Sequence, residues 1–203
     1  MLEIIKIFLA IVCGYFLGSI PFGLFIGLKV KGIDIREHGS GNIGATNVTR
    51  IVGKKWGITA FILDVIKGFF AGKIGFWLAG PIGGVAGGVA AIAGHMLPIW
   101  LNFKGGKGIA TGLGFLFAVM PITGIVGFST WAVVTFISGY VSLGSICAVI
   151  MVLLFAIFYE EYVLYKVLLF IFVSLIIYKH RSNMQRLRKG TESKIDRKKF
   201  FKI

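Results

Sequence analysis

The chain has 203 residues, of which 57% are hydrophobic and 29 are glycine, and its formal net charge is +14. A mean hydropathy of +0.89 excludes an ordinary soluble domain and indicates that lipid surrounds most of the chain. The basic residues lie in short polar segments and the aromatic residues inside the apolar runs, a distribution that excludes the basic, aromatic-bearing face of a nucleic-acid-binding protein. No nucleic acid partner is expected, and we assign the charge to loops that face anionic headgroups and substrates.

The first apolar run, residues 4–28, is too long for the apolar core of a secretory signal, and it is preceded by Glu3. We interpret it as a membrane helix, because a helix of about twenty apolar residues crosses the hydrocarbon layer with all its backbone groups hydrogen-bonded. The full set of predicted spans is 4–28, 56–79, 82–101, 109–125, 126–141, 143–159 and 162–179. Within 109–158 the sequence is almost continuously apolar and allows either two long helices or three short ones.

Charge decides between these alternatives. The first polar loop and the C-terminal tail are strongly basic, whereas residues 80–94 carry no charge and Glu160–Glu161 form an acidic turn. The positive-inside rule then places the N-terminus outside and the C-terminus in the cytoplasm, which requires an odd number of spans. We therefore predict an all-α, polytopic integral membrane protein with seven transmembrane helices, broken near Met120-Pro121 and near Ser138-Gly139-Tyr140. It forms a single domain over 1–203, with a basic cytoplasmic tail from about residue 180.

The first cytoplasmic segment, residues 39–50, opens with a formal G-x-G-x-x-G pattern. It follows a membrane helix rather than a strand, so the dinucleotide-binding interpretation fails. The glycines allow close backbone approach to a ligand, and polar side chains gather beside the cation Arg50. These side chains are Ser40, Asn42, Thr46 and Asn47. We predict a polar ligand site here, the alternative being a solvated, flexible turn.

The second segment contains the run Lys104-Gly105-Gly106-Lys107-Gly108. A Walker A loop would place Ser or Thr after its last lysine, where Gly108 stands, so this is not an ATPase loop. Glycine N–H groups, a helix start and two ammonium groups in one place predict a phosphate site that extends to Thr111. The alternative is that the glycines serve helix packing. His95, shortly before this run, is either structural or part of the site.

The third segment places His180 and Asn183 three residues apart, on one side of a helix that continues out of the membrane. For these two residues we favour a functional role, and for residues 194–202 a basic tail that contacts anionic lipid.

Two further pairs of residues lie inside the apolar runs. Asp64 and Lys67, also three residues apart, form an opposite-charge pair that is structural by default and shapes the site in a second interpretation. Cys13 and Cys147 lack metal-ligand spacing and are interpreted as small buried side chains. No metal and no cofactor are expected.

No Ser-His-acid triad is evident in the sequence. The H-x-x-x-x-D pattern of thioester-dependent glycerolipid acyltransferases is also absent, because Ile43, Trp100 and Gln185 stand five positions after the three histidines. Three stretches, GSGNIGATNVTR, GHMLPIWLNFKGGKGIATGLG and HRSNMQRLRKGTESK, together resemble the three cytoplasmic motifs of the bacterial acyl-phosphate:glycerol-3-phosphate acyltransferase family. The resemblance runs through nearly the whole chain and includes LDVIKG in the second predicted span.

The resemblance implies an inner-membrane enzyme that moves a fatty acyl group from acyl phosphate to the 1-hydroxyl of glycerol 3-phosphate and faces the cytoplasm. It marks as catalytic Ser40, Arg50, Lys104, His180 and Asn183. It gives the second motif a substrate-phosphate role and Glu192 a structural one. Its partners would be these two substrates, membrane lipids and, functionally, the upstream enzyme that forms acyl phosphate. Either His180 or a substrate phosphate serves as base.

Two other classes of protein compete with this interpretation. A small phosphate-ester transporter would use similar cationic loops but would need charged or broken helices near the membrane midplane. A non-catalytic lipid-binding protein would explain the basic tail but not the Lys-Gly-Gly-Lys-Gly loop.

Overall fold

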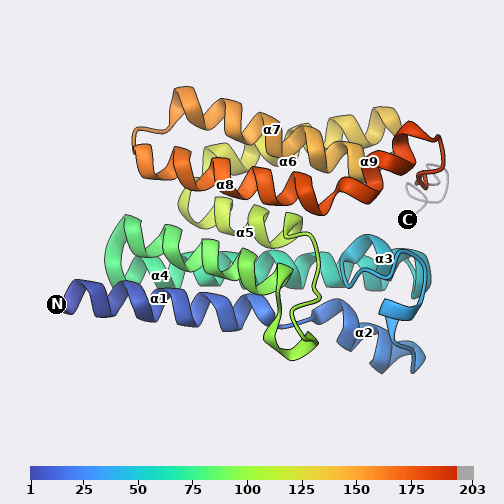
Figure 1. Cartoon of the computed structure of the whole chain (residues 1–203), viewed down its shortest axis with the longest axis horizontal. Coiled ribbons are helices and arrows are strands. Elements are labelled where there is room, and N and C mark those ends of the chain that lie inside the picture. Colours follow the sequence, from blue (N-terminus) through green and yellow to red (C-terminus); the bar gives the residue numbers. More distant parts are fainter. Residues whose placement is uncertain (196–203) are drawn as a thin grey trace. The chain divides into compact units, whose positions relative to one another are not determined.

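The structure, a computed structural model, describes residues 1–195. These residues form helices and no strand (Figure 1). The chain divides into two compact units, Met1–Pro121 and Ile122–Ile203, and each is described by itself. Unit 1 contains α1 (Leu2–Ser19), α2 (Phe22–Lys31), η1 (Ile35–Glu37), α3 (Ala45–Ile51), α4 (Lys54–Met96), η2 (Ile99–Leu101) and α5 (Ile109–Val119). Unit 2 contains nearly all of α6 (Pro121–Ser138), then α7 (Val141–Tyr159), α8 (Val163–Lys179) and α9 (Arg181–Arg188).

The all-α prediction is confirmed. Among the described residues, four helical stretches are long and apolar enough to cross a membrane, and a fifth qualifies if the bent pair α8–α9 counts as one span. The count of seven spans, the direction of the termini and the single-domain organisation stay predictions.

The first apolar run forms one candidate span, Leu2–Lys31, in agreement with the predicted span 4–28. It is broken into α1 and α2, so the expectation of one continuous helix is wrong. Ile20 adopts an extended conformation with ψ 116° between α1 and α2. Pro21 follows it, and proline disfavours the helical conformation in the residue before it and supplies no N–H group. The Ile20 carbonyl is thereby freed from the regular ladder of α1.

Helix α4 is a hairpin of two arms, residues 54–78 and 81–96. Ala79 and Gly80 have non-helical backbone angles between the arms, and Gly80 lies at φ 60°, where glycine meets no steric penalty. A Cβ atom added to Gly75 would collide with the carbonyl of Gly83, which shows that the arms pack backbone to backbone. The predicted spans 56–79 and 82–101 correspond to these arms, although the second arm ends at Met96.

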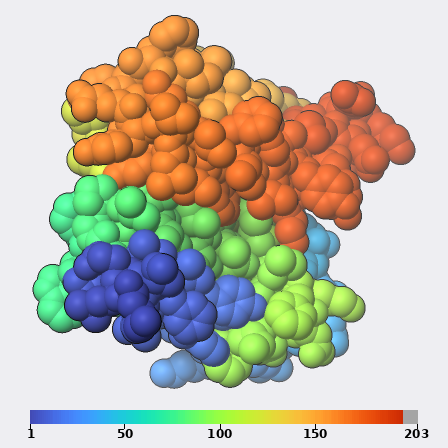
Figure 2. All heavy atoms as spheres, turned by 60° about the vertical axis from the view of Figure 1, so that its left-hand side comes forward, coloured from blue at the N-terminus to red at the C-terminus, as the bar shows by residue number. Residues whose placement is uncertain are grey.

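Helix α1 packs along the second arm of α4 at glycine contacts. A Cβ atom at Gly14 would collide with the backbone of Gly87, and one at Gly18 with the backbone of Ala91. Small residues permit this close approach of helices in lipid, where no hydrophobic force drives them together. Figure 2 shows α1 lying against the α4 hairpin.

The apolar stretch 109–158 forms three helices, as predicted, with breaks at Met120 and at Gly139. The boundary expected between residues 125 and 126 is wrong. Helix α6 already begins at Pro121, because proline fits the first position of a helix, where its missing N–H would have no partner.

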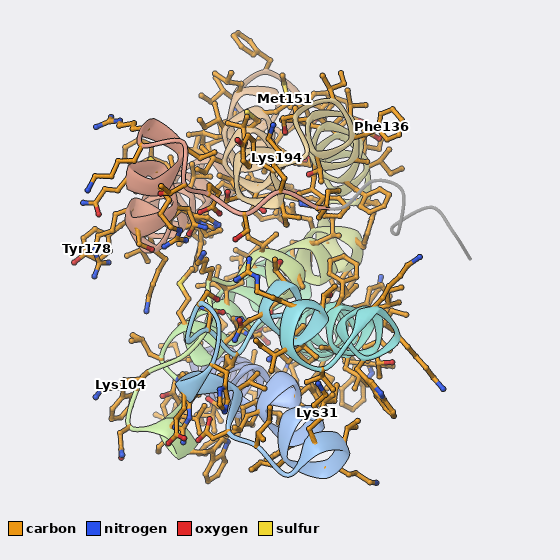
Figure 3. The ribbon with its side chains drawn as sticks, turned by 90° about the vertical axis from the view of Figure 1, so that its right-hand side faces the viewer. Lys31, Lys104, Phe136, Met151, Tyr178 and Lys194 are labelled. Atoms are coloured by element: carbon orange, nitrogen blue, oxygen red, sulfur yellow. The ribbon has the colours of Figure 1, made fainter. Side chains whose placement is uncertain are left out.

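In unit 2, α8 and α9 meet at an angle of 53°. The chain then returns to the α6–α7 connection, where the N–H of Ile195 donates to the carbonyl of Gly139 over 2.9 Å. Lys194, labelled in Figure 3, belongs to this returning segment, and its ammonium lies 5.2 Å from the centre of the Tyr140 ring. The predicted lipid-contacting tail lies almost entirely outside the described residues.

Candidate functional site

The first and second polar segments of unit 1 share one apolar core. Buried side chains from α2, η1, α3 and α4 meet Leu101 of η2 in this core. Its members are Leu24, Ile26, Ile35, Ile43, Val48, Ala60 and Leu101. Burial of this apolar surface therefore holds the loop around Ser40 and the loop before Lys104 at the same end of unit 1.

Asn47 organises the first segment from within. Its amide group donates to the carbonyls of Ile35 and His38 over 3.0 and 3.1 Å, and its oxygen accepts from the N–H of Ser40 over 3.0 Å. The side chain is only 1% exposed, so these bonds replace water. Asn47 therefore holds the first segment in shape through these three hydrogen bonds. Its role in substrate binding stays a prediction.

Polar side chains predicted to meet the ligand line the outside of this loop. Ser40, Thr46 and Arg50 are exposed, and Asn42 is half-buried, with its side-chain oxygen accepting from the N–H of Gly44 over 2.8 Å. Arg50 lies near the end of α3. The segment thus presents a hydroxyl group and a guanidinium group to the solvent on a rigid support.

The carboxylate of Asp34, shortly before this loop, is already paired. The Arg36 guanidinium donates to both oxygens of Asp34 over 3.0 Å. This bond outweighs the opposing effect of burial and lowers the pKa of Asp34. Asp34 therefore stays ionised, and Arg36 neutralises its charge. The Asp34 carboxylate thus does not cancel the positive charge that Arg50 gives to the first segment.

The second segment leaves α4 and closes back onto it. The N–H of Gly105 donates to the carbonyl of Met96 over 3.2 Å, and that of Gly106 to the carbonyl of His95 over 2.9 Å. The N–H groups of these two glycines are thus bonded within unit 1, and the predicted contribution of Gly105 and Gly106 to substrate binding stays a prediction. The N–H groups without an intrahelical partner are those in the first turn of α5, which begins at Ile109.

The turn before Lys104 is strained. Asn102 and Phe103 have φ values of 49° and 60°, which are uncommon for residues with a side chain and cluster at functional sites. Lys104 follows with an exposed side chain, labelled in Figure 3 on the loop between α4 and α5. The turn thus leaves the ammonium group of Lys104, the first lysine of the Lys-Gly-Gly-Lys-Gly run, exposed at the surface of unit 1.

Two other residues predicted for this segment are buried. The ring of His95 stands directly against Gly106, where a Cβ atom would collide with its Nε2 atom. On its other side, Nδ1 of His95 lies 2.9 Å from the ammonium of Lys67. Thr111 is 0% exposed, and among residues 1–195 its hydroxyl has no hydrogen-bond partner. Sequence reasoning left His95 without a partner because Lys67 lies 28 residues away.

In unit 2, His180 lies in the bend between α8 and α9, so the helix does not simply continue through it as expected. Its Nδ1 atom lies 2.8 Å from the carbonyl oxygen of Ile176. A carbonyl can only accept, so Nδ1 carries the proton and the neutral ring has its lone pair on Nε2. The side chain is 2% exposed, which holds this orientation.

Asn183 belongs to a network centred on Glu192. One carboxylate oxygen accepts from the amide of Asn183 over 2.6 Å and from the hydroxyl of Ser142 over 2.8 Å, and the other accepts from Nε of Arg186 over 2.6 Å. Ser142 was missed by sequence reasoning, because it lies 50 residues before Glu192 inside an apolar helix. The network ties α7, α9 and the tail together.

This network gives unit 2 an acid-sensitive element. Burial raises the pKa of Glu192, but the bonds from Asn183, Ser142 and Arg186 outweigh it and leave the pKa below its ordinary range. A lowered folded-state pKa stabilises the fold above the unfolded pKa of about 4.3, and this contribution disappears as pH falls through the folded value.

Replacing Glu192 by glutamine removes the charge that these donors share, and hydrogen bonds to a charged group contribute about 1.5–3 kcal/mol. We expect the Tm in detergent to fall by roughly 5–10 °C at pH 7, since 1 kcal/mol corresponds to about 2–4 °C in a chain of this size. The wild type should lose this advantage progressively as the pH falls from about 4.3 through the lower folded-state pKa of Glu192. Glu161→Gln, at an exposed position in the same unit, is the control. Equal melting of E192Q and wild type at pH 7 would refute the network's role.

The fold and these segments define a class of protein, an integral membrane helical protein with a cationic glycine loop. The profile of the family described as glycerol-3-phosphate acyltransferase matches residues 8–190. A glycerol-3-phosphate acyltransferase from Acholeplasma laidlawii is 40% identical, over 100% of this chain and 98% of the relative. One from Aquifex aeolicus (strain VF5) is 44% identical, over 92% of this chain and 98% of the relative.

Solved structures agree. The glycerol 3-phosphate form of PlsY, an integral membrane glycerol 3-phosphate acyltransferase, matches with a TM-score of 0.90 and 40% identity, over 97% of this chain and 99% of that one. A lysophosphatidic acid form matches with a TM-score of 0.85 and 41% identity, over 93% and 95%. The chain belongs to the glycerol-3-phosphate acyltransferase family.

Proposed function

We propose that the protein transfers a fatty acyl group from acyl phosphate to the 1-hydroxyl of sn-glycerol 3-phosphate. The products are lysophosphatidate and inorganic phosphate, in the first step of bacterial phospholipid synthesis. One observation carries the proposal, the near-complete match to an acyltransferase solved in a glycerol 3-phosphate form and in a lysophosphatidic acid form. These molecules are the acceptor and the product of such a transfer. In this scheme the reaction uses no metal and no cofactor.

The bond changes set what the protein must supply. The hydroxyl oxygen attacks the acyl carbonyl carbon, the bond from that carbon to the phosphate oxygen breaks, and phosphate leaves with the electron pair. The hydroxyl proton passes to a base. Acyl phosphate is an activated mixed anhydride, so positioning and charge stabilisation contribute more than a covalent nucleophile would.

In unit 1, we assign the phosphate of glycerol 3-phosphate to the loop that opens α5. Support comes from the exposed ammonium of Lys104, from the adjoining Lys107 and Gly108, and from the N–H groups in the first turn of α5. A water-soluble substrate suits this exposed loop. Ser40 and Arg50 of the first segment, which shares its core with η2, add a hydroxyl group and a cation.

In unit 2, we assign the role of base to Nε2 of His180. The bond from Nδ1 to the Ile176 carbonyl supports this role, because it leaves the lone pair of the neutral ring on Nε2. Asn183, fixed by Glu192, orients a substrate oxygen. A substrate phosphate that accepts the proton itself is the competing assignment.

We assign the protein to the bacterial inner membrane, with these segments facing the cytoplasm. The basic residues of all three segments support this orientation, because positively charged loops stay on the cytoplasmic side. The enzyme that forms acyl phosphate would then be a functional partner on the same side, and membrane lipids would surround the helices.

The purified protein in detergent, given palmitoyl phosphate and glycerol 3-phosphate, is expected to release lysophosphatidate and phosphate in equal amounts. Mass spectrometry identifies the product, and NMR distinguishes the 1-acyl from the 2-acyl isomer. Acyl-CoA offered in place of palmitoyl phosphate is the donor control and should give no product. Product from acyl-CoA alone would disprove the donor assignment. Absence of product from both donors, with glycerol 3-phosphate moving across vesicles, would favour a transporter.

A further inference from the structure

We propose that Asp64 and Lys67 are positioning residues for the substrate-phosphate loop and act on it through His95. The inference rests on the proposed function of that loop and adds two residues in the membrane-spanning hairpin to its machinery. The chain carries these residues inside an apolar helix, where ionisable side chains are costly and usually functional.

The ammonium of Lys67 is the centre of a buried cluster. It lies 2.7 Å from Oδ1 of Asp64 on the same arm of α4 and 2.9 Å from Nδ1 of His95 on the other arm. It also donates to the carbonyl of Ile20, in the break between α1 and α2, over 2.9 Å. The side chains of Asp64, Lys67 and His95 are between 2% and 5% exposed. The cluster thus joins three chain segments where water does not reach.

The chemistry of the ammonium fixes the state of His95. A charged lysine has three N–H donors and no acceptor. Here it donates to the Ile20 carbonyl and lies within hydrogen-bond distance of Nδ1 of His95, while Oδ1 of Asp64 is its ion-pair partner and accepts no hydrogen bond among the described residues. Because an ammonium can only donate, we infer that Nδ1 of His95 accepts and that the proton of the neutral imidazole lies on Nε2. The opposite tautomer, with a proton on Nδ1 facing Oδ1 of Asp64 at 3.6 Å, is the alternative that the NMR measurement excludes or supports. Asp64 compensates the lysine charge within the cluster, so that the histidine can stay neutral beside it.

His95 transmits this arrangement to the loop in two ways. Its carbonyl accepts the N–H of Gly106, and its ring occupies the space beside the Gly106 Cα atom. A displacement of the ring would therefore move Gly106. Because α5 begins at Ile109, only three residues later, the start of α5 and the intervening Lys107 would move as well. The same cluster is anchored at Ile20, so the loop is held against α1 as well as α4.

A wild-type measurement tests the first step. The chain has 3 histidines, so 15N-histidine labelling in detergent micelles gives few signals, which single His→Gln variants assign. We expect His95 to carry its proton on Nε2 and His180, which donates from Nδ1, to show the opposite tautomer. A proton on Nδ1 of His95 would overturn the proposal without any appeal to activity.

Kinetics test the second step. In the double variant Asp64→Asn with Lys67→Met, no buried charge is left unpaired, and such replacements are often tolerated. We expect its Tm to stay close to wild type while the KM for glycerol 3-phosphate rises about tenfold or more, because the loop is displaced. The KM for palmitoyl phosphate and kcat should change less than the KM for glycerol 3-phosphate. Lys73→Met, an exposed lysine on the same arm, should stay within about twofold of wild type in every parameter.

The outcomes separate the two proposals. An inactive wild type refutes the proposed function, whereas an active wild type with a folded double variant of unchanged KM refutes only the positioning role and leaves a structural ion pair. If the double variant fails to fold, the tautomer of wild-type His95 decides. In either case Lys73→Met shows whether loss of any α4 lysine has the same effect.

Discussion

Replacing His180 by glutamine is expected to lower kcat by about 10²-fold or more, the usual contribution of a positioned general base. The ring donates from Nδ1 to Ile176 and so presents Nε2 as acceptor, in a side chain that is almost fully buried. Glutamine can form a similar hydrogen bond but cannot take up a proton near neutral pH. The acidic limb of the pH profile of kcat, where a histidine base is lost by protonation, should disappear in the variant.

The matched control is His38→Gln. His38 lies directly before the first segment, at the end of η1, and has an exposed side chain. Its backbone carbonyl, which accepts from Asn47, survives the change. Its kcat should stay within about twofold of wild type, as for a surface substitution. If H180Q kept both the kcat and the pH profile of wild type, the base would be a substrate phosphate instead.

Adding one methyl group at Gly106 is expected to raise the KM for glycerol 3-phosphate by about 10²-fold, a typical penalty for misplacing a binding group. The new Cβ atom would collide with Nε2 of His95. That ring cannot retreat easily, because Lys67 contacts its opposite edge, and Lys67 is itself held by Asp64 and Ile20. The loop must then shift away from the ring. Initial rates over a range of glycerol 3-phosphate concentrations give the KM and so measure this effect.

Gly112→Ala provides a control in the same region. Gly112 lies one turn into α5, and its added Cβ atom would lie 3.6 Å from the Cδ1 atom of Ile92, an ordinary van der Waals contact. Because alanine favours a helix by about 1 kcal/mol over glycine, this variant should fold at least as well as wild type with an unchanged KM. A normal KM in G106A would show that the loop tolerates displacement and would weaken its assignment to phosphate.

The sequence alone determined that this protein lies in lipid and that it is helical, but not where every helix begins and ends. Long apolar runs in lipid must be helical, because no water is present to satisfy the backbone, and prolines and glycines mark where helices break. The break at Pro21 was missed although its signal is local, since the apolar run on both sides hid it. The cationic glycine segments were also visible, because an excess of lysine, glycine and asparagine stands out in an apolar chain.

Only the tertiary structure decided which of these groups act together. His95 gains its partner because the α4 hairpin turns at Gly80 and brings it beside Lys67, 28 residues away. Asn183 is fixed by Glu192, which also binds Ser142 across 50 residues. Such contacts depend on the register of packed helices, and that register is set by the close approach of glycines such as Gly75 and Gly83. Periodicity along a chain identifies helices, whereas the pairing of distant side chains follows from how those helices pack.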